Sequence, residues 1–264
     1  MLLVHSPTQE GQTLRGRRGL MNLSGDARLA LDPCLFFERV VGSPPDLFQR
    51  ELLTSLEPRE LACCGRGTGK STAIAASAAH QILYSPGSLV IVGSPALQNS
   101  QELGRKIFEF VKTVQPEVKS ENLSRIELLN RSRCICLPAS ESTRGLHGCE
   151  LLILEEAQLI EPSMWSVLLP FQATAKAPRL RVLGTPRAKI GRFWECYNGG
   201  NFKTLRVKSS ECSRITPEFL AQQLATIGLH EYSMEYDAEF SDPSTALVGY
   251  DLIARGFDDG AVWI

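Results

Sequence analysis

Residues 59–72 read RELACCGRGTGKST, and this stretch decides the fold. Its first six residues favour a strand, which the glycines at positions 65, 67 and 69 bring to an end. The next segment, Ser71 to Tyr84, is rich in alanine and contains no proline, so it favours a helix. A strand, a glycine-rich loop and a helix in this order form a site where loop amides and the helix N-terminus bind phosphate.

The loop predicts a bound nucleoside triphosphate, ATP, together with Mg²⁺. We expect Lys70 to reach the β and γ phosphates and Ser71 to bind the magnesium. The full pattern G-x-x-x-x-G-K-[ST] has a glycine where this chain has Cys64, a departure at the entry to the loop. A chance glycine-rich turn is the alternative explanation. The predicted nucleotide-binding residues of the loop are Gly65, Arg66, Gly67, Thr68, Gly69, Lys70, Ser71 and Thr72.

Two carboxylates follow the apolar run LLIL at residues 151–154. In enzymes with such a phosphate-binding loop, the first acid at this point holds magnesium and the second orients the attacking water. Because neighbouring side chains on a strand point to opposite sides, we assign Glu155, together with Ser71, to the metal and Glu156 to catalysis. The usual first acid is aspartate, so Glu155 is one methylene longer, and Mg²⁺ has strict coordination geometry. The alternative is a strand end that merely reaches solvent.

The rest of the chain alternates strand and helix patterns, which is typical of an α/β protein with βαβ units. Continuous apolar runs predict strands covered on both faces of a mostly parallel sheet, with helices on both faces. Ligands of such sheets bind at the carboxyl ends of the strands. Further strands are predicted at 88–93, 132–137, 151–154 and 180–183, and helices at 46–53 and 99–114.

The composition, with 264 residues, 43% hydrophobic residues and a formal net charge of −1, excludes a disordered chain, a collagen or a coiled-coil rod. No global positive charge indicates nucleic acid, so any DNA contact must rest on a local patch. The segment 179–192 has five basic residues and no acidic residue, and we expect it to contact DNA phosphates. The alternative is a charged strand edge that discourages aggregation. The basic residues of this segment are Arg179, Arg181, Arg187, Lys189 and Arg192.

Eight cysteines are scattered along the chain, and we expect reduced, buried thiols and no disulfide framework. The spacing of Cys134, Cys136 and Cys149 gives little support to a zinc site. No run approaches the roughly 18 apolar residues of a membrane span, so we expect no membrane association. Residues 1–24 are predicted to be a disordered extension.

Taken together, the motifs resemble the ATPase domain of tailed-phage terminase large subunits, the motors that package viral DNA. The resemblance covers about residues 29–250. It implies a P-loop NTPase fold of the RecA/ASCE type, with the ATPase domain at 25–240 and a linker remnant at 241–264. The stretches that carry it are 45–53, 65–71, Ser94-Pro95, Thr143-Arg144-Gly145, 151–157, Gly184-Thr185-Pro186 and Gly191-Arg192-Phe193.

The resemblance also implies roles for four side chains. Gln49 resembles the glutamine that reads the adenine edge, for which an amide has the right donor and acceptor pair. Arg66 matches the arginine of the phosphate loop, and Arg144 resembles a finger that neutralises transition-state charge, in cis or on a neighbour's nucleotide. Thr185 matches the coupling motif thought to transmit the state of the γ-phosphate. The alternatives are a helix-surface glutamine, solvated arginines and a turn threonine before proline.

The predicted function is therefore a Mg²⁺-dependent ATPase that powers packaging of double-stranded viral DNA in the cytoplasm of a host cell. Terminases of this kind usually carry a second, nuclease domain, and we expect no nuclease activity from this chain. The implied partners are double-stranded DNA, a portal protein, a small terminase subunit and further copies of the chain in a ring. Two alternatives stay open: a helicase-like P-loop ATPase, and a truncated, non-catalytic prophage remnant.

Overall fold

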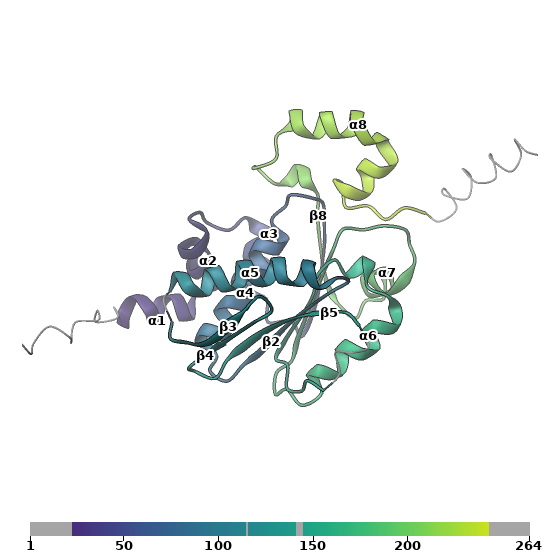
Figure 1. Cartoon of the computed structure of the whole chain (residues 1–264). Coiled ribbons are helices and arrows are strands. Elements are labelled where there is room, and N and C mark those ends of the chain that lie inside the picture. Colours follow the sequence, from purple (N-terminus) through teal and green to yellow (C-terminus); the bar gives the residue numbers. More distant parts are fainter. Residues whose placement is uncertain (1–22, 115, 141–144, 243–264) are drawn as a thin grey trace, which may run out of the picture.

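The computed structural model describes residues 23–114, 116–140 and 145–242. Within these ranges one sheet of eight strands forms the centre of the molecule, in the order β3-β4-β5-β2-β6-β7-β1-β8 (Figure 1). The six strands from β5 to β8 are parallel, and β3 and β4 extend the sheet in antiparallel pairing. The strands are β1 (Arg59–Cys64), β2 (Leu89–Ser94), β3 (Val118–Asn122), β4 (Arg125–Leu128), β5 (Arg133–Pro138), β6 (Leu151–Leu154), β7 (Arg179–Gly184) and β8 (Lys203–Val207).

Helices cover both faces of this sheet. One face carries α2 (Pro33–Val41), α3 (Leu47–Thr54), α4 (Lys70–Tyr84) and α5 (Leu97–Thr113), with α1 (Leu23–Leu31) packed on α2. The other face carries α6 (Pro162–Leu168) and α7 (Gly191–Asn198) with the short 3₁₀ turns η2 (Ala157–Leu159) and η3 (Leu169–Gln172). The mostly parallel α/β sheet with helices on both faces is thus confirmed.

The last helix stands apart from both layers. After β8 the chain passes through η4 (Ser209–Glu211) into α8 (Pro217–Glu235), which lies beyond the end of the sheet (Figure 1). The hydroxyl of Thr216 accepts a hydrogen bond from the Phe219 amide and so caps the start of α8. Gly228, with φ of 78°, interrupts the helix with a kink. This arrangement brings both ends of α8 to the phosphate loop that follows β1.

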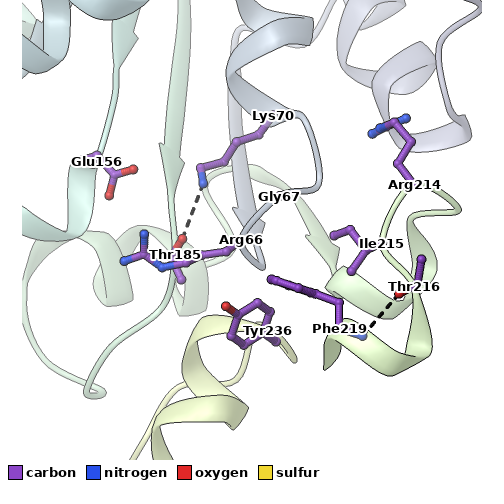
Figure 2. A pocket seen from close by; sticks show the side chains of 10 residues that line it. All are labelled: Arg66, Gly67, Lys70, Glu156, Thr185, Arg214, Ile215, Thr216, Phe219 and Tyr236. Carbon is purple, nitrogen blue, oxygen red and sulfur yellow. Dashed lines mark hydrogen bonds between the residues drawn. The ribbon is translucent and has the colours of Figure 1, made fainter. Parts of the chain in front are cut away.

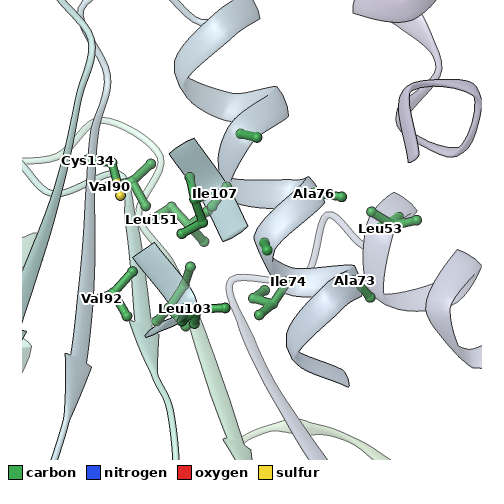
Figure 3. Packing of buried hydrophobic residues seen from close by; sticks show 14 of the residues in the cluster. Leu53, Ala73, Ile74, Ala76, Val90, Val92, Leu103, Ile107, Cys134 and Leu151 are labelled. Atoms are coloured by element: carbon green, nitrogen blue, oxygen red, sulfur yellow. The ribbon is translucent and has the colours of Figure 1, made fainter. Parts of the chain in front are cut away.

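The central strand β6 shows why a continuous apolar run predicts a strand with helices packed on both faces of the sheet. All four of its residues are buried. Leu151 and Ile153 belong to the core under α4 and α5, whereas Leu152 and Leu154 belong to the core under α6 and α7. On the first side the small alanines of α4 let it approach the sheet closely, next to Leu103 and Ile107 of α5 (Figure 3).

The predicted strands at 59–64, 88–93, 132–137, 151–154 and 180–183 correspond to β1, β2, β5, β6 and β7, and the predicted helices are α3, α4 and α5. The sequence patterns did not predict β3, β4, β8, the helices α1 and α2 or the helices α6 to α8. Of residues 1–24, predicted to be disordered, Leu23 and Ser24 form the start of α1, and residues 1–22 lie outside the described residues. Of the predicted linker at 241–264, positions 243–264 also lie outside them. Among the helices that the structure describes, none combines the length and apolar composition that crossing a bilayer requires.

Candidate functional site

The loop between β1 and α4 has the backbone shape that its glycines predict. Gly67 and Gly69 adopt left-handed conformations with φ of 77° and 88°, and Gly69 caps the start of α4. Gly65 is required by crowding, because a Cβ there would lie 2.4 Å from Ser209 Oγ and 2.6 Å from the Tyr236 carbonyl oxygen. The loop amides and the start of a helix of 15 residues therefore face the same space.

Lys70 points from the start of α4 toward the end of β7. Its side chain is buried, and Nζ donates a hydrogen bond of 3.4 Å to Thr185 Oγ1. Thr185 follows the last residue of β7, and β7 pairs with β1. Parallel pairing therefore brings the lysine of the loop and the predicted coupling threonine together.

Ser71 and Glu155 meet at the end of β6. The serine hydroxyl donates a hydrogen bond of 2.6 Å to Glu155 Oε1, and the second oxygen, Oε2, is buried without a hydrogen-bond partner. Burial raises the pKa of Glu155, while the Lys70 charge opposes this shift. An orphaned carboxylate oxygen beside a hydroxyl is a hard oxygen donor set, which fits Mg²⁺. The two residues predicted to hold the metal are thus in contact.

Glu156 reaches its position by a turn and not by strand alternation. β6 ends at Leu154, and Glu156 has a left-handed backbone with φ of 51°, uncommon for a residue other than glycine. Its Oε2 accepts a hydrogen bond of 2.7 Å from Gln158 Nε2. The pleat that we expected to separate the two carboxylates is therefore the wrong explanation, although Glu156 does face the cavity described next.

A cavity of about 670 Å³ joins these side chains. Figure 2 shows Lys70, Glu156, Thr185 and Arg66 toward one side of it. Residues from the segment before α8 and from its two ends form the opposite side: Arg214, Ile215, Thr216, Phe219 and Tyr236. Gly67 completes the lining. The volume lies in the range of sites for small molecules and cofactors.

No sequence motif predicts this second side of the cavity. Arg214 and Thr68 are in hydrogen-bond contact although they are 146 residues apart. The sequence of residues 214–219 looks like an ordinary helix start. These residues line the cavity only because α8 folds back over the phosphate loop.

Arg66 is paired and not merely solvated. Its guanidinium forms a salt bridge with Glu235 at the end of α8, and this hydrogen bond raises the pKa of Arg66. The Arg66 amide also donates to the Glu235 carbonyl oxygen at 2.7 Å, and Ser209 Oγ donates to the Arg66 carbonyl oxygen at 2.7 Å. The phosphate loop is thus connected to both η4 and α8.

Gln49 lies inside the protein and not on a helix surface. Only 2% of it is exposed, and its carboxamide bridges the backbone amide of Asp46 and the carbonyl oxygen of Gly69. It is not among the residues that line the cavity. Its predicted reading of adenine stays a prediction. Arg144, the predicted finger, lies outside the described residues.

The predicted basic patch divides into two groups. Arg181 is 1% exposed and forms an ion pair of 3.2 Å with the buried Glu60, so the expectation that it contacts DNA is wrong. The alternative of a protective strand edge fails too, because β7 lies between β6 and β1 inside the sheet. Arg179 is half-buried against Gln81. Arg187, Lys189 and Arg192, which follow β7, are exposed.

Comparisons with known proteins show which proteins this chain is similar to. The family model for the helicase domain of the RNA cytidine acetyltransferase NAT10/TcmA matches residues 62–177. The chain is 24% identical over 260 residues to the protein "Terminase, large subunit" of Thermus phage G20c, an alignment that takes in 83% of this chain and 53% of the relative. The corresponding protein of Thermus virus P23-45 is also 24% identical, over 259 residues. The chain therefore spans about half the length of the curated relatives it matches.

Solved structures extend the similarity to the fold. The ATPase domain of the Thermus phage P74-26 large terminase aligns with a TM-score of 0.70 at 21% identity, over 80% of this chain and 99% of that one. The large terminase of bacteriophage HK97 gives 0.63 at 14% identity, over 80% and 55% of the two chains. The large terminase of a thermophilic bacteriophage, solved in complex with ADP, gives 0.61 at 8% identity, over 74% and 54%. The resemblance to terminase ATPase domains and the P-loop NTPase fold are thus confirmed.

Proposed function

We propose that this chain is the ATP-hydrolysing motor domain of a phage terminase large subunit, which uses ATP and Mg²⁺ to move double-stranded viral DNA. The observation that carries this proposal is the contact of Ser71 with Glu155 beside the cavity that Lys70 and Glu156 line. The similarity to phage terminases supports the choice of motor. A complex of one such relative with ADP supports the choice of nucleotide.

Each side chain has a task in hydrolysis. The loop amides and Lys70 bind the β and γ phosphates, and Ser71 with Glu155 would hold Mg²⁺. When bound there, the ion would offset the negative charge of the β and γ phosphates. Glu156 orients a water molecule and accepts its proton as the water oxygen attacks the γ phosphorus and the bond to the β-phosphate oxygen breaks. Thr185 holds the Lys70 ammonium in place.

The remaining partners belong to the same proposal. Arg187, Lys189 and Arg192 lie within seven residues after Thr185, and a contact with DNA phosphates there would be close to the nucleotide. Arg144 would neutralise charge on the γ-phosphate, in this chain or on a neighbour's nucleotide, as its motif implies. A ring of copies, a portal protein, a small terminase subunit and the host cytoplasm follow from the terminase resemblance.

A helicase-like ATPase is the second candidate, because the helicase-domain model matches residues 62–177. The two functions differ in what happens to the DNA. A packaging motor moves an intact duplex, whereas a helicase separates its strands. A strand-displacement assay with a labelled duplex and ATP distinguishes them, since release of single strands would support the helicase.

Substitution of Glu156 tests the proposed ATPase. We expect Glu156→Gln to lower the steady-state rate of ATP hydrolysis by roughly 100-fold or more, because it removes the general base. MgATP binding, measured by calorimetry, should be retained. Glu161→Gln is the matched control, since Glu161 is an exposed residue at the start of α6 outside the cavity. A wild-type chain that binds no ATP at millimolar concentration would leave only the non-catalytic remnant.

A further inference from the structure

The carboxylate of Glu156, the proposed general base, is held by a glutamine two residues further along the chain. Its Oε2 accepts the hydrogen bond of 2.7 Å from Gln158 Nε2, and among the described residues no other hydrogen bond or ion pair to this carboxylate is found. Glu156 lies in a turn with a left-handed backbone, so the pleat of a strand does not fix the direction of its side chain. The direction of the carboxylate therefore depends on Gln158.

The other end of the Gln158 carboxamide lies against β7. Gln158 Oε1 is buried, and the described part of the chain supplies no hydrogen-bond partner for it. A Cβ on Gly184, the last residue of β7, would collide with this oxygen and would lie 2.9 Å from two atoms of the Phe193 ring. The absence of a side chain at Gly184 thus makes room for the carboxamide, which extends from Glu156 to the end of β7 just before Thr185.

The orientation of this carboxamide favours the carboxylate over its own oxygen. A buried oxygen without a hydrogen bond is costly, and native structures keep few such groups. In the reverse orientation Gln158 Oε1 would face Glu156 Oε2, and two acceptors repel each other while the carboxylate is ionised. The donor therefore stays on Glu156 at the cost of an unpaired amide oxygen.

The turn that contains Gln158 does not require this side chain. Backbone hydrogen bonds close η2, and the first joins the Leu159 amide to the Glu156 carbonyl oxygen at 2.9 Å. The second joins the Ile160 amide to the Ala157 carbonyl oxygen at 3.2 Å. Gln158 does not line the cavity either, so a nucleotide bound there meets Glu156 and not Gln158. The contact with Glu156 is what connects this glutamine to the chemistry.

We propose that Gln158 is a positioning residue for ATP hydrolysis, which holds Glu156 Oε2 so that Oε1 faces the cavity and accepts the proton of the attacking water. This inference rests on the proposed function, since it needs Glu156 as the general base. Positioning of a base acts on the chemical step and not on nucleotide binding. Loss of the hydrogen bond should therefore lower kcat and leave KM unchanged.

Gln158→Met tests this role, because methionine has a similar shape and cannot donate a hydrogen bond to a carboxylate. A hydrogen bond to a charged group corresponds to roughly 10- to 100-fold in rate, so kcat for ATP hydrolysis should decrease by that factor. The dissociation constant of MgATP, measured by calorimetry, should stay within about twofold of the wild-type value. Gln158→Glu, which keeps the shape and replaces the donor by an oxygen, is a second variant and should lose at least as much.

Gln172→Met is the matched control. The Gln172 side chain is also half-buried, and its Nε2 donates a hydrogen bond of 2.8 Å to the Arg179 carbonyl oxygen. It belongs to η3 and does not line the cavity. We expect kcat and KM of this variant to equal those of the wild type.

A double-mutant cycle separates positioning of the base from a general effect on the fold. In the Glu156→Gln chain the base is absent, so Gln158→Met has nothing left to position. Adding it there should change the rate of ATP hydrolysis in a single turnover by less than about twofold.

Three results would overturn this proposal alone. The first is a wild-type kcat in both Gln158 variants. The second is a Gln158→Met effect of full size in the Glu156→Gln chain, and the third is loss of MgATP binding in both Gln158 variants, since either would show that the side chain supports the fold. A wild-type chain that does not hydrolyse ATP, or a Glu156→Gln chain that hydrolyses it at the wild-type rate, would instead overturn the proposed function, and this proposal with it.

Discussion

The hydroxyl of Ser71 donates a hydrogen bond of 2.6 Å to Glu155 Oε1, although 84 residues separate the two. Ser71 stands in the first turn of α4, and Glu155 follows β6. The extra methylene of glutamate, compared with the usual aspartate, does not prevent this contact. It leaves Glu155 Oε2 buried and unpaired at the place where a cation would bind.

Removing the charge of Glu155 should change how stability depends on pH. Burial raises the pKa of Glu155 above its ordinary value of 4.5, so the folded chain binds this proton more tightly than the unfolded chain does. Stability is then highest below the ordinary value and decreases as the pH rises toward the raised one. Without metal, the Tm of Glu155→Gln should therefore be higher than that of the wild type at pH 7. Near pH 4 the two proteins should have the same Tm. Each 1 kcal/mol of difference corresponds to about 2–4 °C in Tm.

The metal provides the control for this prediction. MgATP should stabilise the wild type more than Glu155→Gln, which lacks the carboxylate. Thermal denaturation between pH 4 and pH 8, with and without MgATP, measures both effects. Parallel profiles for the two proteins would contradict the interpretation of a buried, destabilising charge.

The hydroxyl of Thr185 should matter more than its methyl group. Thr185→Val removes the acceptor of the Lys70 hydrogen bond, and a hydrogen bond to a charged group corresponds to a rate effect of roughly 10- to 100-fold. We expect kcat for ATP hydrolysis to decrease by that factor, and Thr185→Ser, which keeps the hydroxyl, to stay near the wild type. Equal rates for the valine and serine variants would show that the contact plays no part in turnover.

Arg181 and Glu60 form a buried ion pair with exposed fractions of 1% for each residue. Arg181→Met should destabilise the chain by about 3–5 kcal/mol, because it leaves the Glu60 carboxylate buried without this partner. The double variant Arg181→Met/Glu60→Leu should recover more than half of the loss. Urea denaturation measures both, and a double variant no better than the single one would contradict the prediction. Arg105→Ala, which removes two exposed ion pairs on the surface of α5, is the control and should leave the midpoint unchanged.

DNA binding should depend on the exposed members of the basic patch. Arg187→Ala and Lys189→Ala should each weaken binding to duplexes of any sequence and lower the slope of log K against log salt by about 1. Fluorescence anisotropy at several salt concentrations measures this slope. Arg105→Ala should leave this slope unchanged, because α5 covers the opposite face of the sheet from α7. If the salt slope of all three variants equals that of the wild type, the segment that contains Arg187 and Lys189 does not contact the DNA.

The sequence predicted the elements that depend on local patterns. Of the five parallel strands that it identified, β2 and β6 are continuous apolar runs, and β1, β5 and β7 are short apolar segments that include charged residues. The phosphate loop is a short segment in which three glycines alternate with other residues before Lys70. It failed where the pattern is ambiguous. The exposed strand β3 carries no apolar alternation, and β8 has buried residues only at Leu205 and Val207. The basic residues of 179–192 look alike along the chain, and only the position of β7 inside the sheet separates Arg181 from Arg187.

By itself, the sequence determined the phosphate loop, the buried strands and the pair of acids that follows β6, because glycine conformation, helix propensity and apolar runs act over a few neighbouring residues. Only the tertiary structure decided that Ser71 touches Glu155, that Arg181 is buried on Glu60, and that the segment around Phe219 closes one end of the cavity. Those contacts join residues far apart in the chain. They follow from the order in which the strands pair and from the return of α8 over the loop, which no local pattern encodes.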